Sequence, residues 1–243
     1  MTSPFDSATG PSGNSRPVAT IRGSTHAPSV EMAASYAAPG EHCQPALPPA
    51  LAACRACRRC PGVVPGSAVL DLPGGPRPVL FVGEAPGRLG AARSGRPFVG
   101  DVAGARFAAL LAASGLDPSG VAVTNAVLCL PLDSRGRNRR PSAGEIRACA
   151  SWLATAIDHV RPAVIVPLGT TALAALEQLR PHGARLRDAV ARPRDWGGLV
   201  LFPLYHPGAR AAIHRPLERQ LDDWRTLGDF VRSLAAADIE HSR

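Results

Sequence analysis

The chain has 243 residues, of which 45% are hydrophobic, and it carries a net charge of +8 to which arginine contributes without any lysine. This length fits one α/β domain with a tail, or two small domains. No apolar run reaches the roughly 18 residues of a membrane span, and no secretory signal opens the chain, so we expect a cytoplasmic protein. The basic surplus favours a polyanionic partner, nucleic acid first, although an arginine-rich composition alone also raises the charge.

Residues 1–48 are rich in proline, glycine and serine and show no apolar periodicity, so we expect a disordered tail. An ordered domain over 49–236 and a flexible end over 237–243 follow. Apolar runs predict strands, and apolar faces at helical spacing predict helices. In chain order these are a strand at 79–82, a helix at 102–114, a strand at 121–124, a helix at 142–159, a strand at 163–168, a helix at 170–179, a strand at 199–204 and a helix at 217–236.

The alternation of strands with helices predicts a three-layer α/β/α sandwich around a central, mainly parallel four-stranded sheet. The helix over 142–159 opens with a capping box, Ser142 followed by Glu145 three residues later. In such sheets a ligand binds beyond the carboxyl ends of the strands. Those ends carry glycine-rich and polar segments, which points to a site at this edge.

Four side chains near this edge suit work on a flat, polar ligand. Glu84 is set in a glycine- and proline-rich turn and can orient a water, while Asn125 ends a strand and carries both a donor and an acceptor. Phe98 can stack on a base, and His206 can donate to a developing oxyanion. Structural roles stay open for three of them, namely a surface turn for Glu84, a strand-end amide for Asn125 and a core aromatic for Phe98. Asp101 is also a candidate cap for the helix that follows it.

Six cysteines occur, and five of them belong to a metal-type pattern. Cys54, Cys57 and Cys60 follow one another at C-x-x-C spacing, whereas Cys129 lies after the second strand and Cys149 on the next helix. Four thiolates suit either zinc or an iron–sulfur cluster. Cys43 and one member of the triplet are left as free thiols.

Taken together, these motifs resemble the iron–sulfur uracil-DNA glycosylases of families four and five. The resemblance runs from about residue 54 to residue 234. It is carried by six segments, namely Gly83-Glu84-Ala85-Pro86-Gly87, Gly95-Arg96-Pro97-Phe98-Val99-Gly100, the run from Val123 to Cys129, the run from Arg137 to Ser142, the run from Arg161 to Val166, and Tyr205-His206-Pro207.

The resemblance implies the roles of the catalytic residues. Glu84 positions the attacking water, Asn125 reads the polar edge of uracil, and His206 stabilises the charge on the leaving base. Phe98 stacks on the flipped base. The turn of Gly83, Ala85, Pro86 and Gly87 holds a uracil carbonyl, and Arg210 binds DNA.

The resemblance also implies a 4Fe-4S cluster held by Cys57, Cys60, Cys129 and Cys149. Pro61 directly after Cys60 favours that pair, with Cys54 and Cys57 as the alternative. The cluster has a structural role, since hydrolysis needs no electron.

Two departures from the family pattern bear on the chemistry. Gly208 stands where the His-Pro-Ser motif has serine, and the Arg88-Leu89-Gly90 stretch leans toward family five, whereas Glu84 is typical of family four. The branch that traps a covalent sugar adduct uses a histidine in the basic segment after the second strand. Residues 130–140 contain none, so we expect no covalent adduct.

The expected function is therefore a DNA-repair hydrolase that flips uracil out of single- or double-stranded DNA and cleaves its N-glycosidic bond. Residues 208–215 can fill the gap in the duplex, with Arg210 and Arg215 on phosphates and His214 at the surface. We expect a monomer associated with the nucleoid and with no membrane. The alternatives are a non-catalytic iron–sulfur DNA-binding protein of the same fold and a zinc-stabilised nucleotide-binding enzyme.

Overall fold

The fold is taken from a computed structural model that describes residues 47–241. The expectations for the tail and for Cys43 therefore concern residues outside the described part, apart from 47 and 48. The α-helices are α2 (Pro49–Ala52), α3 (Ala91–Ser94), α4 (Val102–Ser114), α5 (Ala143–Val160), α6 (Thr170–Leu179), α7 (Leu186–Ala189) and α8 (Leu217–His241). The 3-10 helices are η1 (Ala53–Ala56), η2 (Pro118–Gly120) and η3 (Ala209–Ile213).

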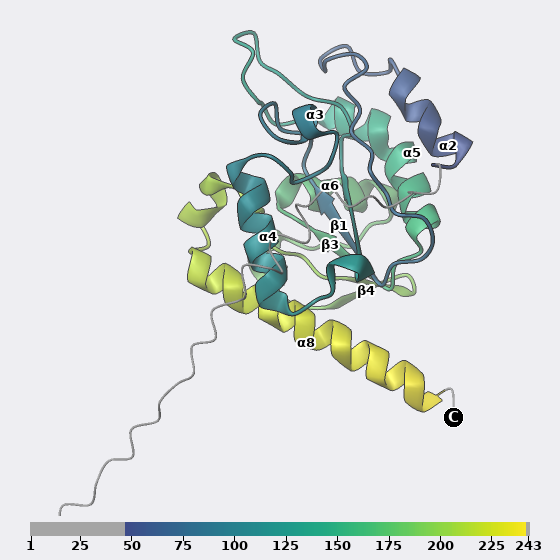
Figure 1. The fold of residues 1–243 in the computed structure, drawn as a ribbon, viewed down its shortest axis with the longest axis vertical. Coiled ribbons are helices and arrows are strands. Elements are labelled where there is room, and N and C mark those ends of the chain that lie inside the picture. The colour runs from purple at the N-terminus through teal and green to yellow at the C-terminus, as the bar shows by residue number, and fades with distance from the viewer. Residues whose placement is uncertain (1–46, 242–243) are drawn as a thin grey trace, which may run out of the picture.

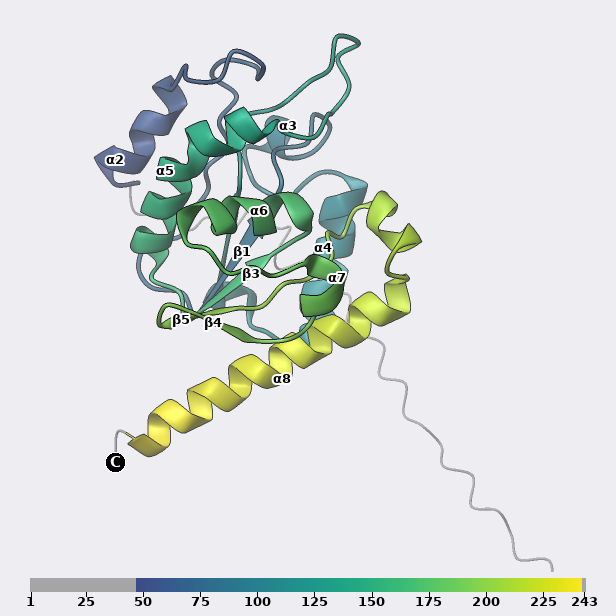
Figure 2. The ribbon, with the colours of Figure 1, turned by 180° about the vertical axis from the view of Figure 1, so that it is seen from behind.

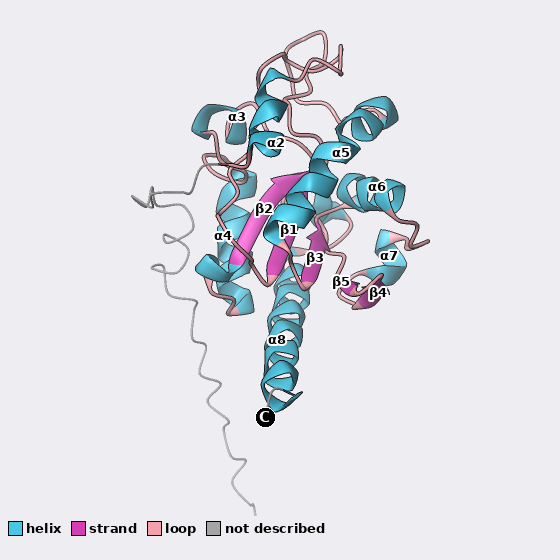
Figure 3. Cartoon of the chain, turned by 90° about the vertical axis from the view of Figure 1, so that its right-hand side faces the viewer, coloured by secondary structure: helices cyan, strands magenta, loops and turns pink. Residues whose placement is uncertain are grey.

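One sheet forms the middle layer. Its strands are β1 (Val79–Gly83), β2 (Val121–Asn125), β3 (Val164–Pro167), β4 (Arg194–Trp196) and β5 (Leu199–Leu201), and their order is β2-β1-β3-β5-β4. The first four in that order run parallel, and β4 pairs antiparallel with β5. Figure 3 shows the strands between α4 on one side and α5 and α6 on the other. The three-layer α/β/α architecture is thus confirmed.

The side chains of β1 alternate between two apolar clusters, one on each face of the sheet. Leu80 and Val82 pack with residues of α5 and α6, the helices in front in Figure 2, whereas Phe81 packs with residues of α4 and α8. On the second face the ring of Trp224 from α8 stacks on Phe81 at 5.1 Å and meets Phe107 of α4 edge-on at 5.4 Å. The helices on both faces therefore pack against β1, an inner strand of the sheet.

The sheet has five strands and not the expected four. The fifth, β4, joins β5 through Gly197 and Gly198, both of which have a positive φ, as a tight two-residue hairpin turn requires. A Gly-Gly pair directly before an apolar run is a sequence signal for a β-hairpin. The prediction of a single strand at 199–204 did not take it into account. The ladder there stops at Leu201 and resumes only as a bridge between Leu168 and Leu204.

The predicted helices form with small changes at their ends. The capping box of Ser142 and Glu145 is present at the start of α5, and Asp101 caps α4 by accepting from the Gly104 N–H at 2.9 Å. The last helix continues past the expected end at 236 to His241, well beyond the sheet in Figure 1. Within residues 47–241 no helix is long and apolar enough to cross a membrane.

Candidate active site and cysteine cavity

The carboxyl ends of β1 and β2 open onto a cavity of about 160 Å³. The two strands are in register, so that Gly83 pairs with Asn125 at the rim. The lining residues come from four chain segments that converge there: Glu84, Ala85, Pro86, Gly87, Ala91, Phe98, Asp101, Ala103, Asn125, Pro131, Asn138, Arg139 and His206. All three side chains predicted to be catalytic line this cavity, and so does the aromatic side chain predicted to stack.

Gly83 is required at the end of β1 because two side chains crowd its Cα. A Cβ at this position would overlap the Asn125 Oδ1 and lie 3.0 Å from the Phe98 Cε2. The amide of Asn125 and the ring of Phe98 therefore meet across a gap that only glycine leaves open. Gly83 itself is buried, and its carbonyl accepts from the Ala126 N–H at 2.9 Å. It shapes the cavity without lining it.

Phe98 lines the cavity and is held there by two neighbouring rings. Its ring stacks on Phe107 at 4.7 Å with an interplanar angle of 14°, and it is tilted against the His206 ring at 5.5 Å. Its backbone has a φ of +54°, a left-handed conformation that is costly for an aromatic residue. A Cβ on Gly104 would collide with the carbonyl of Phe98, so glycine in α4 makes room for this turn.

The carboxylate of Glu84 is anchored through one of its two oxygens. Thr171, in the first turn of α6, donates its hydroxyl to the Glu84 Oε2 at 2.6 Å, and the Arg140 Nε lies 3.6 Å from the same oxygen. No described residue hydrogen-bonds to Oε1 of this carboxylate. That second oxygen is thus free for a water molecule in the cavity.

The surroundings of His206 favour a neutral ring with its proton on Nε2. Its Nδ1 accepts a hydrogen bond from the Gly208 N–H at 2.9 Å, which leaves Nε2 as the protonated nitrogen of the neutral ring. Burial lowers the pKa of His206, although the negative charges of Glu84 and Asp101 oppose that shift. Glycine at 208 allows this contact, because a Cβ there would lie 2.8 Å from Nδ1. The departure from the His-Pro-Ser pattern therefore goes with a particular placement of the ring.

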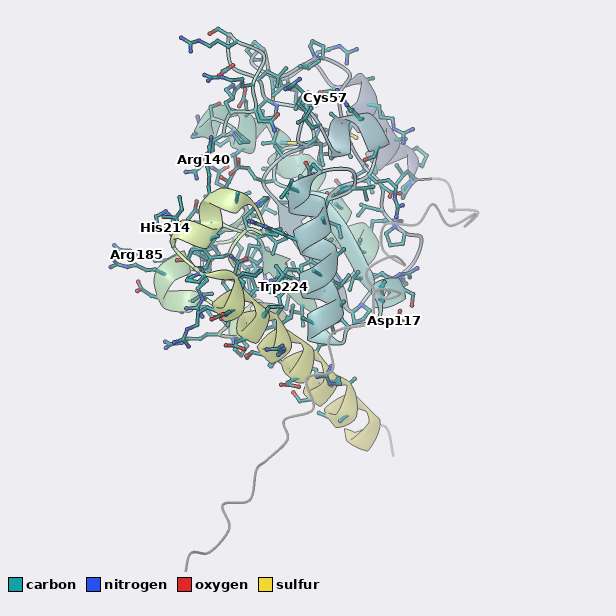
Figure 4. All side chains as sticks on the ribbon, turned by 60° about the vertical axis from the view of Figure 1, so that its left-hand side comes forward. Cys57, Asp117, Arg140, Arg185, His214 and Trp224 are labelled. Carbon is teal, nitrogen blue, oxygen red and sulfur yellow. The ribbon has the colours of Figure 1, made fainter. Side chains whose placement is uncertain are left out.

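The two arginines after His206 that were expected on phosphates differ in their surroundings. Arg210 is exposed on η3 and does not line the cavity. Arg215 makes a two-pronged ion pair with the buried Asp223, with its Nε 2.8 Å from one carboxylate oxygen and its Nη2 2.5 Å from the other. Arg215 is thus engaged in the fold. His214 is exposed, as expected, and Figure 4 shows it at the surface.

The loop between β2 and α5 projects from the strand-end side of the molecule, at the top of Figures 1 and 2. Its Asn138 accepts from the Arg88 N–H at 3.0 Å, which joins the loop to the Glu84 turn. Its Arg139 uses every N–H of the guanidinium group. These bonds reach the backbone carbonyls of Leu132, Arg140 and Gly62 and both oxygens of Glu145.

Sequence reasoning gave no role to Thr171, Asn138 or Arg139. Thr171 lies two residues after Gly169, in the segment that follows the carboxyl end of β3. Extending the argument from strand ends into the first turn of the following helix was the signal that could have found it. Asn138 and Arg139 belong to the Arg137–Ser142 run that carried the resemblance, but the contact of Asn138 with Arg88 and that of Arg139 with Gly62 join segments distant in the chain.

A second cavity, of about 130 Å³, is lined by five cysteines. They are Cys54, Cys57, Cys60, Cys129 and Cys149, and none forms a disulfide. Burial raises the pKa of Cys54 to about 11 and that of Cys149 to about 12, and it also raises the pKa of Cys60 and Cys129. Buried thiols become good ligands only when a cation offsets the charge of the thiolate.

The metal-binding side chains that line this cavity are all thiols, which are ligands of both iron–sulfur clusters and zinc. Among residues 47–241, no three His, Cys, Asp or Glu side chains converge tightly enough to hold a single metal ion. All five cysteines nevertheless line this one cavity. Figure 4 places Cys57 at the end of the molecule away from the tip of α8.

The sequence matches the family model described as Uracil DNA glycosylase superfamily over residues 73–227. It is 35% identical to the Type-4 uracil-DNA glycosylase of Thermotoga maritima, over 62% of this chain and 76% of that protein. The Type-4 uracil-DNA glycosylase of Pyrobaculum aerophilum is also 35% identical, over 74% of this chain and 86% of the relative. The Type-5 uracil-DNA glycosylase of Thermus thermophilus is 36% identical, over 53% of this chain and 63% of that protein.

Proposed function

Because this chain belongs to the uracil-DNA glycosylase superfamily, we propose that its strand-end cavity binds a flipped uracil and hydrolyses its N-glycosidic bond, as the first step of DNA repair by base excision. The observation that carries the assignment is the convergence of Glu84, Phe98, Asn125 and His206, from four separate segments, on one cavity of about 160 Å³. The comparisons favour this enzyme over the non-catalytic binding protein.

The cavity positions the base before any bond breaks. Phe98, backed by Phe107, offers a flat surface on which the extruded base stacks, and such stacking is worth about 1–3 kcal/mol. Asn125 ends β2 beside Gly83 and is 97% buried, so its amide is fixed to pair with the polar edge of a pyrimidine. Pro86 and Gly87 line the same cavity and lie beside the proposed position of the base.

The chemistry divides between the two ends of the scissile bond. When the bond to the sugar lengthens, negative charge builds on the uracil carbonyl, and the Nε2–H of the neutral His206 donates a hydrogen bond to it. Positive charge builds on the sugar, and the free Oε1 of Glu84 orients a water toward that carbon and takes its proton. Loss of one donor aimed at the leaving base costs about 10²–10³ in rate.

A 4Fe-4S cluster in the cysteine cavity completes the proposal. Cys57, Cys60, Cys129 and Cys149 are the proposed ligands, and Cys54 with Cys57 is the alternative pair. When bound, the cluster supplies cross-links between chain segments and no step of the hydrolysis. It joins the segment before β1 to the loop after β2 and to α5. A purified protein with a brown colour and broad visible absorbance supports it, and a colourless zinc protein contradicts it.

The substrate and its setting follow from the same surface. We propose that uracil-containing DNA, single- or double-stranded, binds across the strand-end face, with Arg210 on a phosphate and the protein acting as a monomer near the nucleoid. The loop over 130–140 has no histidine, so no covalent adduct to the sugar forms. An adduct that survives denaturing gel electrophoresis contradicts this.

The assignment is tested by base release from a uracil-containing oligonucleotide, followed by alkaline cleavage of abasic sites. We expect Asn125→Ala and His206→Ala to fold normally and to lose about 10²–10³ in single-turnover rate. Leu89→Ala, on an exposed side chain near the cavity but outside its lining, is the matched control. Near-wild-type rates for both cavity variants overturn the site, and absence of cleavage by wild-type protein that still binds uracil DNA overturns the reaction.

A further inference from the structure

We infer that Thr171 is a positioning residue for the reaction, because its hydroxyl fixes the rotation of the Glu84 carboxylate and so aims the remaining oxygen at the water. The inference rests on the proposed function of Glu84 and adds a residue from another layer of the fold. The hydroxyl donates to Oε2 at 2.6 Å across 87 residues of sequence. A hydrogen bond to a charged oxygen at this length is of the strong, charge-assisted kind.

The surroundings of Thr171 make it a rigid donor. Its residue is only 4% exposed, and a β-branched side chain in a helix has few rotamers. The first turn of α6 is held to the rest of the site on both sides. The Gly169 N–H donates to the Leu204 carbonyl at 2.8 Å, and a Cβ on Gly169 would lie 3.3 Å from the Cβ of His206. The start of α6 therefore sets the positions of Glu84 and His206 relative to each other.

Arg140, the other partner of Glu84, cannot fix the carboxylate in the same way. Its side chain is 71% exposed, and its Nε stays 3.6 Å from Oε2. An exposed ion pair at this distance contributes little, since water screens it and the long side chain remains mobile. Figure 4 shows Arg140 at the surface of the strand-end side, where its guanidinium can reach a DNA phosphate.

The two partners should therefore affect different kinetic constants. Without the Thr171 hydroxyl, Glu84 stays in the cavity but its carboxylate rotates freely, so Oε1 is aimed at the water only part of the time. This lowers kcat and leaves DNA binding unchanged. Without Arg140, a contact to the DNA backbone is lost, which raises KM and leaves kcat unchanged.

The experiment measures single-turnover rates and half-saturating concentrations of the full-length protein on a uracil-containing oligonucleotide. Thr171→Val keeps the shape and removes the hydroxyl, and we expect a 10- to 100-fold loss of kcat at constant KM, the range for a hydrogen bond to a charged group. Thr171→Ser restores the hydroxyl and should recover most of the rate. The matched control is Thr170→Val, on the exposed neighbour in the same helical turn.

A double-mutant cycle with Glu84→Gln separates positioning from simple destabilisation. If Thr171 acts through Glu84, Thr171→Val has little further effect in the Glu84→Gln background. Equal losses in both backgrounds, or wild-type kcat for Thr171→Val, overturn the inference. The proposed function fails by a different result, namely wild-type rates for Glu84→Gln or no base release by the wild-type protein. Thermal melting of each variant identifies any that fails to fold, and Thr171→Ser then carries the test through its kcat.

Discussion

Replacing Gly208 by serine should slow the enzyme, although it restores the His-Pro-Ser pattern of the family. In this protein the Gly208 N–H donates to the His206 Nδ1 at 2.9 Å and thereby leaves the proton on Nε2, the nitrogen proposed to donate to the base. The Cβ of any other residue would lie 2.8 Å from the same Nδ1 and 3.3 Å from the Cε1 of the ring. The ring must move to accommodate it.

The size of the effect follows from that overlap. Ordinary contacts of a Cβ begin at 3.4 Å, so the imidazole has to shift by about 0.6 Å. It cannot retreat freely, because the ring of Phe98 lies 5.5 Å away and Gly169 packs behind its Cβ. A misplacement of 1 Å in a catalytic group can cost about 10²-fold in rate, so we expect a loss of about tenfold.

The assay is the single-turnover release of uracil by wild-type protein, Gly208→Ser and Gly208→Ala. Both variants introduce the same Cβ, and only serine adds a hydroxyl, so both should be slower by a similar factor. Gly144→Ala is the matched control, because a Cβ there meets only ordinary contacts at 3.8 Å and beyond. Rates of both Gly208 variants at or above wild type would refute the reasoning, and a loss for alanine that serine avoids would show that the hydroxyl outweighs the overlap.

Three further predictions concern the supports of the site. Lysine at position 139 cannot supply the guanidinium donors that Arg139 shares among three carbonyls and the buried Glu145. Arg139→Lys should therefore lower the free energy of unfolding by about 2 kcal/mol and Tm by about 4–8 °C in thermal melts. An unchanged Tm argues against this. Since burial lowers the pKa of His206, the unfolded chain binds a proton before the folded protein does as pH falls below about 6.5. The free energy of unfolding of the wild type, measured by denaturant titration, should therefore fall relative to that of His206→Ala between pH 7 and 5. Parallel curves for the two proteins contradict this. Cys60→Ala should lose iron and visible absorbance and Cys54→Ala should keep both, with the reverse result favouring the alternative pair.

The sequence predicted the arrangement of the layers and the edge of the sheet that carries the site. Apolar runs and helical faces are local signals, and the rule on strand ends turns them into a place in space without any knowledge of contacts. That is why Glu84, Asn125 and His206 were found and why they line one cavity. No strand was predicted at β4, because this three-residue edge strand has no apolar run of its own.

The supporting contacts were not predictable because they depend on side-chain positions that are set only when the chain has folded, whether the partners are 87 residues apart or eight. Nothing local to Thr171 indicates that it bonds to Glu84, and nothing local to Arg215 indicates that Asp223 engages it. The same holds for the glycines. Gly83 and Gly208 look like turn residues in sequence, and only the positions of the Asn125 and His206 side chains show that a Cβ is excluded there.

The two cavities are connected through the chain that leaves β2, and this gives the cysteines a bearing on catalysis without a chemical step. Asn125 lines the first cavity and Cys129, four residues later, lines the second. The loop that follows returns Arg139 to the first cavity while binding Gly62, which lies two residues after Cys60, and Glu145 on the helix of Cys149. Cross-linking of the cysteines by the proposed cluster would therefore hold fixed the segments that position Asn125 and Arg139. Loss of such a cluster should loosen the strand-end cavity before it unfolds the sheet.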